Sequence, residues 1–437
     1  MKKKKIIKPQ TLKGFRDFPP EDKLLRNKVA KIMEGVFQKF GYDPIENPAL
    51  EYAKVLRGKA GEEEKLGYFF KDQGGREIGL RYDQTIPLAR FVAQYPDLPQ
   101  PFKRYQLQKT WRADKPQKGR YREFYQFDFD IVNSGSRLAD AEVAQILYET
   151  MNALGFKKFV IKINNRKILI SFSQYLGTPP KATVKVLRAI DKLSKIGIEG
   201  VKQELQKLKL ETKTIDKIIS LISIKGTSEQ ILKELKDKLK NIKRATEGIK
   251  ELKTVFSYLK MIDIKGKYFQ LDPCMVRGLD YYTGIIYEID VIEGNIGSVG
   301  GGGRYDNLIG IFTGKKIPAT GIGWGFERLV DLIKERKMIK TPKTVTQVLV
   351  TIFSSNLEEN SIKTASQLRK AKINTEVYLD PQAKLNKQLK YADKKGIPWV
   401  IIIGPEEVKE NLVVLKNMET GKQEKLTLTQ LINKLNN

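Results

Sequence analysis

Histidine is absent from all 437 residues of the chain. Without an imidazole the protein cannot build a Ser-His-Asp triad, a histidine-ligated metal centre or a histidine acid–base step. Its chemistry must therefore depend on arginine, carboxylates, tyrosine, amides and backbone dipoles. That set suits reactions dominated by phosphate charge. No group of side chains is predicted to form a metal site.

Cysteine and long apolar runs are also scarce. Cys274 is the single cysteine, so no disulfide can form within the chain, which fits a reducing compartment. The lysine-rich start has only two isoleucines before Lys8 and Pro9, so the apolar core of a signal peptide is missing. The apolar run at residues 399–403 is far shorter than the roughly 20 residues of a membrane helix. We therefore expect a cytoplasmic protein with no membrane partner.

Positive charge is in large excess. Lysine and arginine number 80 against 51 aspartates and glutamates, which gives a net charge of +29. A charge of this size favours a polyanionic partner such as RNA. A general lysine bias of the genome explains the same excess, since Lys, Ile and Asn are abundant throughout. Composition alone leaves both explanations open.

Two patterns of apolar residues divide most of the chain. Strand-like runs joined by charged turns fill residues 67–132, clearest at Phe102–Trp111 and Glu123–Val132, and predict an antiparallel sheet. Helical spacing recurs through the Lys-, Ile- and Leu-rich segment 176–262. Strand-like and glycine-rich sequence then returns.

Beyond a linker that contains Pro342, strands alternate with helices, which predicts a separate α/β domain with parallel pairing. The predicted fold class is α+β. It comprises an antiparallel-sheet domain at residues 1–175 and 263–336, a helical insertion at 176–262 and a C-terminal α/β domain at 345–437.

The strand Glu123–Val132 has an unusual polar face. Side chains two apart lie on one face of a strand, so Gln126, Asp128 and Asp130 point the same way as Phe124. Amide and acidic groups beside an aromatic ring suit a cationic, hydrogen-bonding ligand. A solvated face of an amphipathic sheet explains the same pattern.

Four further segments combine charged or phenolic groups with turn-forming residues. Each has a structural explanation as well: a helix start, buried tyrosines, a linker, or a strand that leads into a helix. The glycine run is not a P-loop, because Gly-Lys-Ser/Thr does not follow at the required spacing. These segments are residues 80–90, 276–284, 300–306 and 321–329.

Together the segments resemble one family. Residues 112–126, with Arg-Ala-Asp before a loop and Arg-Tyr-Arg-Glu-Phe-Tyr-Gln after it, resemble motif 2 of class II aminoacyl-tRNA synthetases, in the version of the histidyl-tRNA synthetase family. Residues 276–284 and 300–306 resemble that family's two histidine signatures. Residues 41–48 resemble motif 1 and residues 321–329 motif 3. The resemblance implies the class II catalytic sheet and a C-terminal anticodon-binding domain.

Three positions depart from the family pattern. Trp111 stands where phenylalanine is usual, Phe127 where cysteine is common, and Asn133 where glycine is expected. The first two are changes of size beside the site. Asparagine tolerates the positive φ that a glycine position often requires. None of the three removes a charged group.

The resemblance also implies an ATP site. Arg112 would bind the α-phosphate, Phe124 would stack on adenine, and Arg328 would cover the other face of adenine and reach the γ-phosphate. A guanidinium fork bonds phosphate oxygens in a geometry that lysine does not hold. The implied ATP-binding residues are Arg112, Asp114, Arg120, Phe124 and Arg328.

A histidine site is implied beside it. Arg277 would be the leading catalytic residue, together with Arg112, because it would balance charge on the α-phosphate as the carboxylate attacks. Carboxylates are the expected partners of the α-ammonium group, and tyrosines would line the imidazole pocket. The implied histidine-binding residues are Asp83, Thr85, Gln126, Asp130, Arg277, Tyr281, Tyr282 and Tyr305.

The implied reaction is formation of histidyl-adenylate from histidine and ATP, followed by transfer to tRNA(His). Mg²⁺ is expected as a counter-ion of phosphate, and a homodimer is expected from motif 1. Three alternatives stay open. They are a catalytically inactive paralogue, such as a regulatory subunit of ATP phosphoribosyltransferase, an RNA-binding module without an ATP site, and a synthetase for threonine, proline or glycine.

Overall fold

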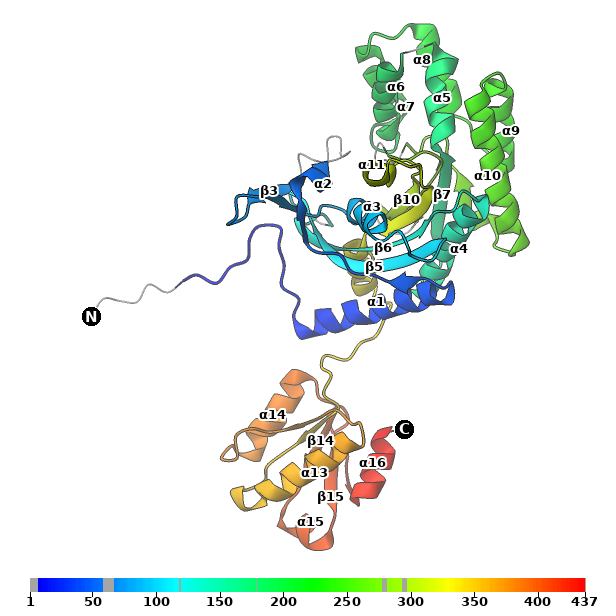
Figure 1. The fold of residues 1–437 in the computed structure, drawn as a ribbon. Helices are drawn as coiled ribbons and strands as arrows, with labels where there is room; N and C mark the ends of the chain where they lie inside the picture. Colours follow the sequence, from blue (N-terminus) through cyan, green and yellow to red (C-terminus); the bar gives the residue numbers. More distant parts are fainter. Residues whose placement is uncertain are drawn as a thin grey trace. The chain divides into compact units, whose positions relative to one another are not determined.

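The computed structural model describes residues 7–57, 67–117, 119–177, 179–276, 281–292 and 297–436. Two compact units make up the chain (Figure 1). The first unit comprises Met1–Asp17 and Val29–Met338, and the second comprises Phe18–Lys28 and Ile339–Asn437.

An eight-stranded sheet forms the centre of the first unit, in the order β1-β5-β6-β11-β10-β9-β7-β8. Its strands are β1 (Asp43–Pro44), β5 (Phe102–Trp111), β6 (Glu123–Val132), β7 (Phe159–Asn165), β8 (Phe269–Leu271), β9 (Ile285–Val291), β10 (Ser298–Arg304) and β11 (Ala319–Trp324). The outermost pairs, β1–β5 and β7–β8, are parallel and the inner pairs are antiparallel. The predicted antiparallel sheet is confirmed.

The hairpin β5–β6 separates an apolar face from a polar one. The two strands pair without a break from Phe102↔Val132 to Trp111↔Glu123. On one face Phe127 and Phe129 are fully buried and contact Phe37 of helix α1 (Pro20–Lys39), with ring centroids 5.0 and 5.1 Å apart. The even-numbered residues of β6 therefore point to the opposite face.

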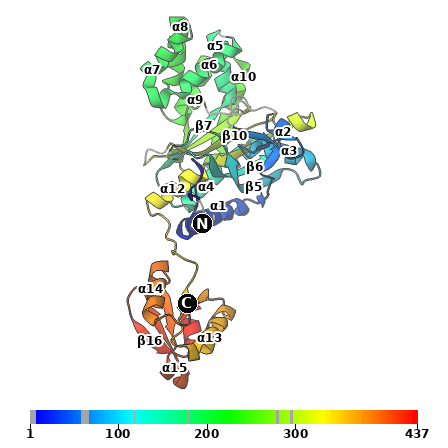
Figure 2. The same cartoon turned by 90° about the vertical axis from the view of Figure 1, so that its left-hand side faces the viewer.

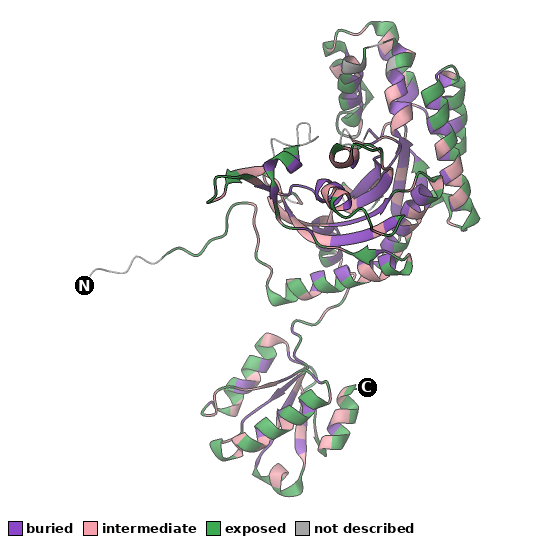
Figure 3. Ribbon diagram, viewed as in Figure 1, coloured by how far each residue is buried: buried purple, intermediate pink, exposed green. Residues whose placement is uncertain are grey.

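Helices cover this sheet, and a smaller sheet of three strands lies beside it. At the start of α4 the side chain of Ser136 accepts a hydrogen bond from the Leu138 amide. Nearby, Asn133 has a φ of 63°, a positive value that asparagine tolerates. Buried strands and exposed outer helix faces are visible in Figure 3. These elements are α2 (Ala53–Arg57), α3 (Thr85–Gln94), α4 (Arg137–Ala153), α5 (Arg166–Leu176), α11 (Gly310–Thr313), α12 (Phe326–Glu335), β2 (Leu50–Tyr52), β3 (Tyr68–Lys71) and β4 (Glu77–Leu80).

Between α5 and β8 the described part of the chain forms five α-helices. They are α6 (Pro180–Asp191), α7 (Leu193–Lys207), α8 (Thr212–Ile222), α9 (Ser228–Leu239) and α10 (Lys243–Met261). In α9 the apolar side chains at helical spacing, Ile231, Leu232, Leu235 and Leu239, are buried. Two views show these helices at the β7 side of the sheet (Figure 1; Figure 2).

The second unit contains a five-stranded sheet in the order β13-β12-β14-β15-β16. The predicted parallel pairing holds for β12–β13 and β12–β14, but the hairpin β15–β16 adds antiparallel pairing that the sequence analysis missed. Its elements are β12 (Val348–Val350), α13 (Glu358–Lys370), β13 (Thr375–Val377), α14 (Leu385–Lys395), β14 (Trp399–Ile402), α15 (Pro405–Glu410), β15 (Val413–Asn417), β16 (Gln423–Leu426) and α16 (Leu428–Asn436). No helix within the described ranges is long and apolar enough to cross a membrane.

Candidate active site

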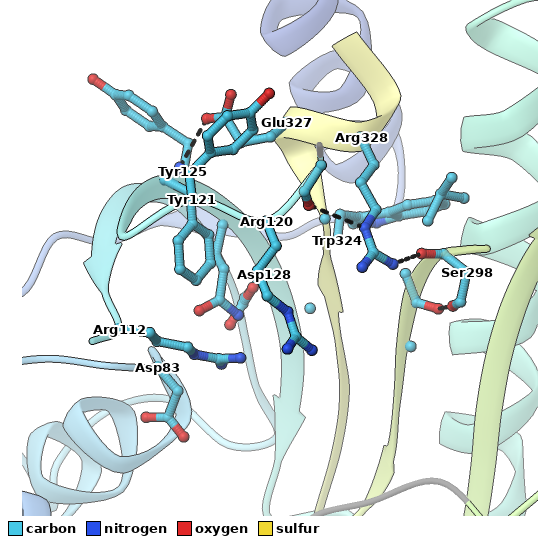
Figure 4. Close-up of a pocket in the computed structure, with 18 of the residues that line it drawn as sticks. Asp83, Arg112, Arg120, Tyr121, Tyr125, Asp128, Ser298, Trp324, Glu327 and Arg328 are labelled. Atoms are coloured by element: carbon cyan, nitrogen blue, oxygen red, sulfur yellow. Dashed lines mark hydrogen bonds between the residues drawn. The ribbon is translucent and has the colours of Figure 1, made fainter. Parts of the chain in front are cut away.

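A pocket of about 410 Å³ opens over the polar face of the main sheet (Figure 4). Strands β6, β10 and β11 form its floor, and the β5–β6 loop, α3 and α12 contribute to its walls. Its lining includes Asp83, Thr85, Arg112, Asp114, Arg120, Tyr121, Phe124, Tyr125, Gln126, Asp128, Tyr281, Tyr282, Ser298, Gly300, Gly323, Trp324, Glu327 and Arg328.

Glycines in the central strands leave room for this pocket. A Cβ atom on Gly323 would lie 3.0 Å from Asp128 Oδ1 and 3.2 Å from Gln126 Nε2. A Cβ atom on Gly302 would lie only 2.1 Å from the carbonyl oxygen of Gly321 on the facing strand. The glycine run is therefore a buried strand of the sheet in which the backbones approach closely.

Three arginines reach the pocket from different elements (Figure 4). Arg112 follows β5, and its Nε donates to the carbonyl of Tyr82 at 2.9 Å. Arg328 of α12 donates from Nη1 to the carbonyl of Ser298 at 2.6 Å. Arg120 lies in the β5–β6 loop, 3.9 Å from a carboxylate oxygen of Asp114. Their common pocket suits a ligand with several negative charges.

Acidic and amide groups line the same pocket, with Asp83 beside Arg112 and Asp128 beside Arg120 (Figure 4). Asp83 Oδ1 accepts the Ile86 amide at 3.3 Å, at the start of α3. Asp128 is 3% exposed, and its Oδ1 has no hydrogen-bond partner among the described residues; the same holds for Oε1 of Gln126. Burial raises the pKa of Asp128 well above its ordinary value, and the nearby charges of Asp130 and Asp83 raise it further, against the opposing effect of Arg104. Buried acceptors without partners favour a ligand that carries N–H donors.

Two tyrosines line the pocket near Asp83. The rings of Tyr281 and Tyr282 lie 4.7 Å apart, and both line the pocket with Thr85. Burial, then the proximity of Tyr282 and Asp83, holds the pKa of Tyr281 well above its usual range. The hydroxyl therefore stays protonated at neutral pH and is able to donate to a ring nitrogen.

Most of the residues implied by the family resemblance meet in this pocket. Asp130 and Tyr305 do not line it. The Tyr305 hydroxyl donates to Asp130 at 2.5 Å, and Arg104 lies 2.6 Å from the other carboxylate oxygen. Arg277 lies outside the described residues. The implied residues that do line the pocket are Asp83, Thr85, Arg112, Asp114, Arg120, Phe124, Gln126, Tyr281, Tyr282 and Arg328.

The sequence analysis did not assign several other lining residues to the site. Asp128 carried a signal, because it shares the strand face of Gln126. Glu327 carried no such signal in the sequence, because its role depends on a long-range contact. Its carboxylate accepts the backbone amide of Tyr125 at 3.0 Å, and the two residues are 202 positions apart. Tyr121 and Ser298 likewise enter the pocket only through the tertiary fold.

The mostly antiparallel sheet, with one arginine after β5 and another on α12 directed into a single pocket, is the catalytic domain of a class II aminoacyl-tRNA synthetase. The profile of the family described as histidyl-tRNA synthetase matches residues 14–329, and that of an anticodon binding domain matches residues 347–437. The chain belongs to the histidyl-tRNA synthetase family.

Similar proteins extend over the full length. The chain is 43% identical to a histidine--tRNA ligase of Clostridium tetani, over 100% of both chains. It is 40% identical to a histidine--tRNA ligase of Aeropyrum pernix, over 97% of both. A crystal structure of histidyl-tRNA synthetase from Nostoc sp. PCC 7120 superposes with a TM-score of 0.88 at 33% identity, covering 99% of each chain.

Proposed function

We propose that this protein activates histidine with ATP and transfers the histidyl group to tRNA(His). The observation that carries the proposal is that one pocket is lined by three arginines together with carboxylates and tyrosines. The carboxylate of histidine attacks the α-phosphorus, pyrophosphate leaves, and a ribose hydroxyl of the tRNA then displaces AMP from the adenylate. Each displacement develops charge on phosphate or carbonyl oxygens, which fixed cationic and N–H groups stabilise.

The arginines are proposed to bind ATP. Arg112 would hold the α-phosphate, since its Nε bond to the Tyr82 carbonyl fixes the plane of the guanidinium. Phe124, whose ring centroid lies 5.4 Å from the Arg112 guanidinium carbon, would stack on adenine, with Arg328 on the opposite side. Arg120 and Asp114 would lie beside the phosphates.

The acidic and phenolic groups are proposed to bind histidine. Asp83, Thr85 and Gln126 would take the α-ammonium group, and Tyr281 and Tyr282 the imidazole. Asp130 and Tyr305 would act from behind this layer, through their mutual hydrogen bond. Arg277 is proposed as a catalytic residue on the family resemblance alone.

Mg²⁺ would enter as the counter-ion of the triphosphate. This ion prefers phosphate oxygens and water, with one or two carboxylates. Asp114 lines the pocket near Arg120 and offers such a carboxylate. When bound, the ion would neutralise charge on the leaving pyrophosphate.

The tRNA partner is supported by the second unit, which matches an anticodon binding domain, and by the net charge of +29. A homodimer is proposed from the resemblance of residues 41–48 to motif 1, and a cytoplasmic location from the single cysteine. The full-length matches to proteins named histidine--tRNA ligase favour the enzyme over the inactive paralogue.

ATP–pyrophosphate exchange tests the proposed function. Purified protein supplied with each of the twenty amino acids should incorporate labelled pyrophosphate into ATP with histidine only, because only an imidazole matches the phenolic and acidic cavity. Omission of Mg²⁺ should abolish the signal. Exchange driven by another amino acid, or no exchange with any, would refute the assignment.

Histidine binding should also depend on the ionisation of Asp128. Because the folded pKa of Asp128 lies above its ordinary 3.8, the empty pocket holds this carboxyl protonated over a wider pH range. A cationic ligand favours the carboxylate, so affinity should rise as pH increases through the raised pKa, and below that pKa binding should release a proton. Calorimetry in two buffers of different ionisation enthalpy measures this proton.

Asp128→Asn supplies the comparison. Free histidine is the same in the experiments with wild type and variant. A difference in the number of protons released on binding therefore reports the contribution of Asp128. The variant should release fewer protons and bind histidine about tenfold more weakly, as expected for loss of one charge-assisted bond. Equal proton release by the two proteins would remove Asp128 from ligand binding.

A further inference from the structure

The N-terminal segment lies against the strand that carries the pocket. The carbonyl of Gly14 accepts the Arg122 amide at 2.9 Å and the Glu123 amide at 3.5 Å. Gly14 has a φ of +89°, and a Cβ atom there would lie 2.9 Å from Cγ of Arg122. Glycine at this position therefore permits a close backbone contact at the start of β6.

Arg16 extends this contact to a second element. Its guanidinium carbon lies 3.3 Å from the centroid of the Tyr121 ring, in the β5–β6 loop. The same guanidinium forms an ion pair with Glu327 of α12 and lies 3.9 Å from Asp331 on that helix. Tyr121 in turn donates to Asp331 at 3.3 Å. Arg16 thus reinforces two direct contacts between the loop and the helix, the Tyr121–Asp331 bond and the bond from Arg328 Nε to the Gly119 carbonyl at 3.4 Å.

Both joined elements carry arginines of the pocket. Tyr121 follows Arg120, and Glu327 precedes Arg328 (Figure 4). Glu327 also accepts the Tyr125 amide, one residue after the Phe124 ring. Because the Glu327 side chain is only 5% exposed, loss of its arginine partner would leave a carboxylate with little access to water. Arg16 therefore contributes to the spacing between loop and helix, together with the contacts that join these elements directly.

We infer that Arg16 is a positioning residue for ATP: it fixes the loop that carries Arg120, and the start of β6 that carries Phe124, against the helix with Arg328 without contacting the nucleotide itself. The inference rests on the proposed function. It predicts that the ATP end of the pocket loosens when Arg16 is removed, whereas the histidine end, built on α3 and the tyrosines, keeps its geometry.

Arg16→Ala tests this inference. In pyrophosphate exchange we expect the KM for ATP to rise about tenfold, while the KM for histidine stays within about twofold, because a charge-assisted bond to a buried carboxylate is lost at one end only. Arg16→Lys should recover part of the loss, since lysine keeps the charge but not the planar stacking on Tyr121.

Arg57→Ala is the matched control. Arg57 also combines an ion pair, 2.9 Å to Glu77, with an aromatic contact, 4.7 Å to the centroid of Phe69. None of these three residues lines the pocket. This variant should exchange pyrophosphate with wild-type constants for both substrates.

Hydrogen–deuterium exchange gives a readout that needs no activity. In ligand-free protein, Arg16→Ala should speed amide exchange in the peptides that cover residues 119–125, and Arg57→Ala should not. Unchanged exchange there, or an unchanged KM for ATP, would overturn the inference. Equal losses of ATP and histidine affinity with a lower unfolding temperature would overturn it too, by showing general destabilisation. Failure of the proposed function is distinguishable, because wild-type protein would then show no histidine-dependent exchange.

Discussion

Arg112→Ala should lower the rate of histidine-dependent pyrophosphate exchange by about 10²–10³-fold, the usual loss when one preorganised group is removed from a developing charge. The reason is its placement. The Nε bond to the Tyr82 carbonyl, at 2.9 Å, holds the guanidinium in one plane at the pocket wall. No reorganisation is then required as charge forms on the α-phosphate. Steady-state exchange with varied ATP and histidine separates kcat from the two KM values.

Arg112→Lys refines this prediction. Lysine retains a positive charge but lacks a second nitrogen with which to bond Tyr82 while it contacts phosphate. We expect it to recover only a minor part of the rate. Arg90→Ala is the matched control, since Arg90 pairs with Glu51 at 2.5 Å and does not line the pocket. A fall in affinity for histidine alone, with kcat unchanged, would contradict the proposed role of Arg112.

The sheet was predictable where a single strand is long enough to show a strand-like residue pattern. The bounds of β5 and β6 agree with the prediction because each is a ten-residue run that contains strand-forming aromatic residues, and β6 alternates polar and apolar side chains from Gln126 to Ile131. The hairpin β15–β16 was missed because its strands are short and half exposed, with only Val413 and Leu415 buried. Hydrophobic alternation over so few positions carries little information.

Strand β10 shows what a local pattern cannot determine. Glycine has a low preference for strands, so four in succession resemble a linker. The glycine run is a strand because β9 and β11 pair with it on both sides. The neighbouring backbones lie so close to Gly302 and Gly303 that a Cβ atom at either position would clash with a carbonyl oxygen. Partners that lie elsewhere in the chain decide the structure here.

The site was predictable in part, for a related reason. Alternation places Gln126, Asp128 and Asp130 on one face of β6. The register of the β5–β6 hairpin then decides which of these side chains is paired with β5 and which is available to bind a ligand. Arg104 lies directly opposite Asp130 and forms an ion pair with it. Contacts such as Arg16 with Glu327, 311 positions apart, leave no trace in either local sequence.

Asp140→Ala should reduce the free energy of unfolding of the first unit by about 3–5 kcal/mol, the usual cost of removing one partner of a buried ion pair. The Asp140 carboxylate, on α4, is fully buried and lies 3.0 Å from both Arg304 and Arg137. Arg304 is the last residue of β10, and its side chain is 1% exposed. Without the carboxylate its charge would remain in a medium that cannot solvate it. The glycine strand would then lose its attachment to the helix.

Glu204→Ala is the comparison that isolates burial as the cause. Glu204 of α7 is likewise shared by two cations, 2.6 Å from Lys192 and 2.7 Å from Lys207, but its side chain is 26% exposed and both lysines are exposed. Water replaces the lost partner there, so the variant should unfold like wild type. Guanidinium denaturation followed by tryptophan fluorescence, in a Trp399→Phe background that restricts the signal to the first unit, measures both variants. Equal losses in the free energy of unfolding for Asp140→Ala and Glu204→Ala would contradict this prediction, because they would show that burial does not raise the cost of breaking the Asp140 ion pair.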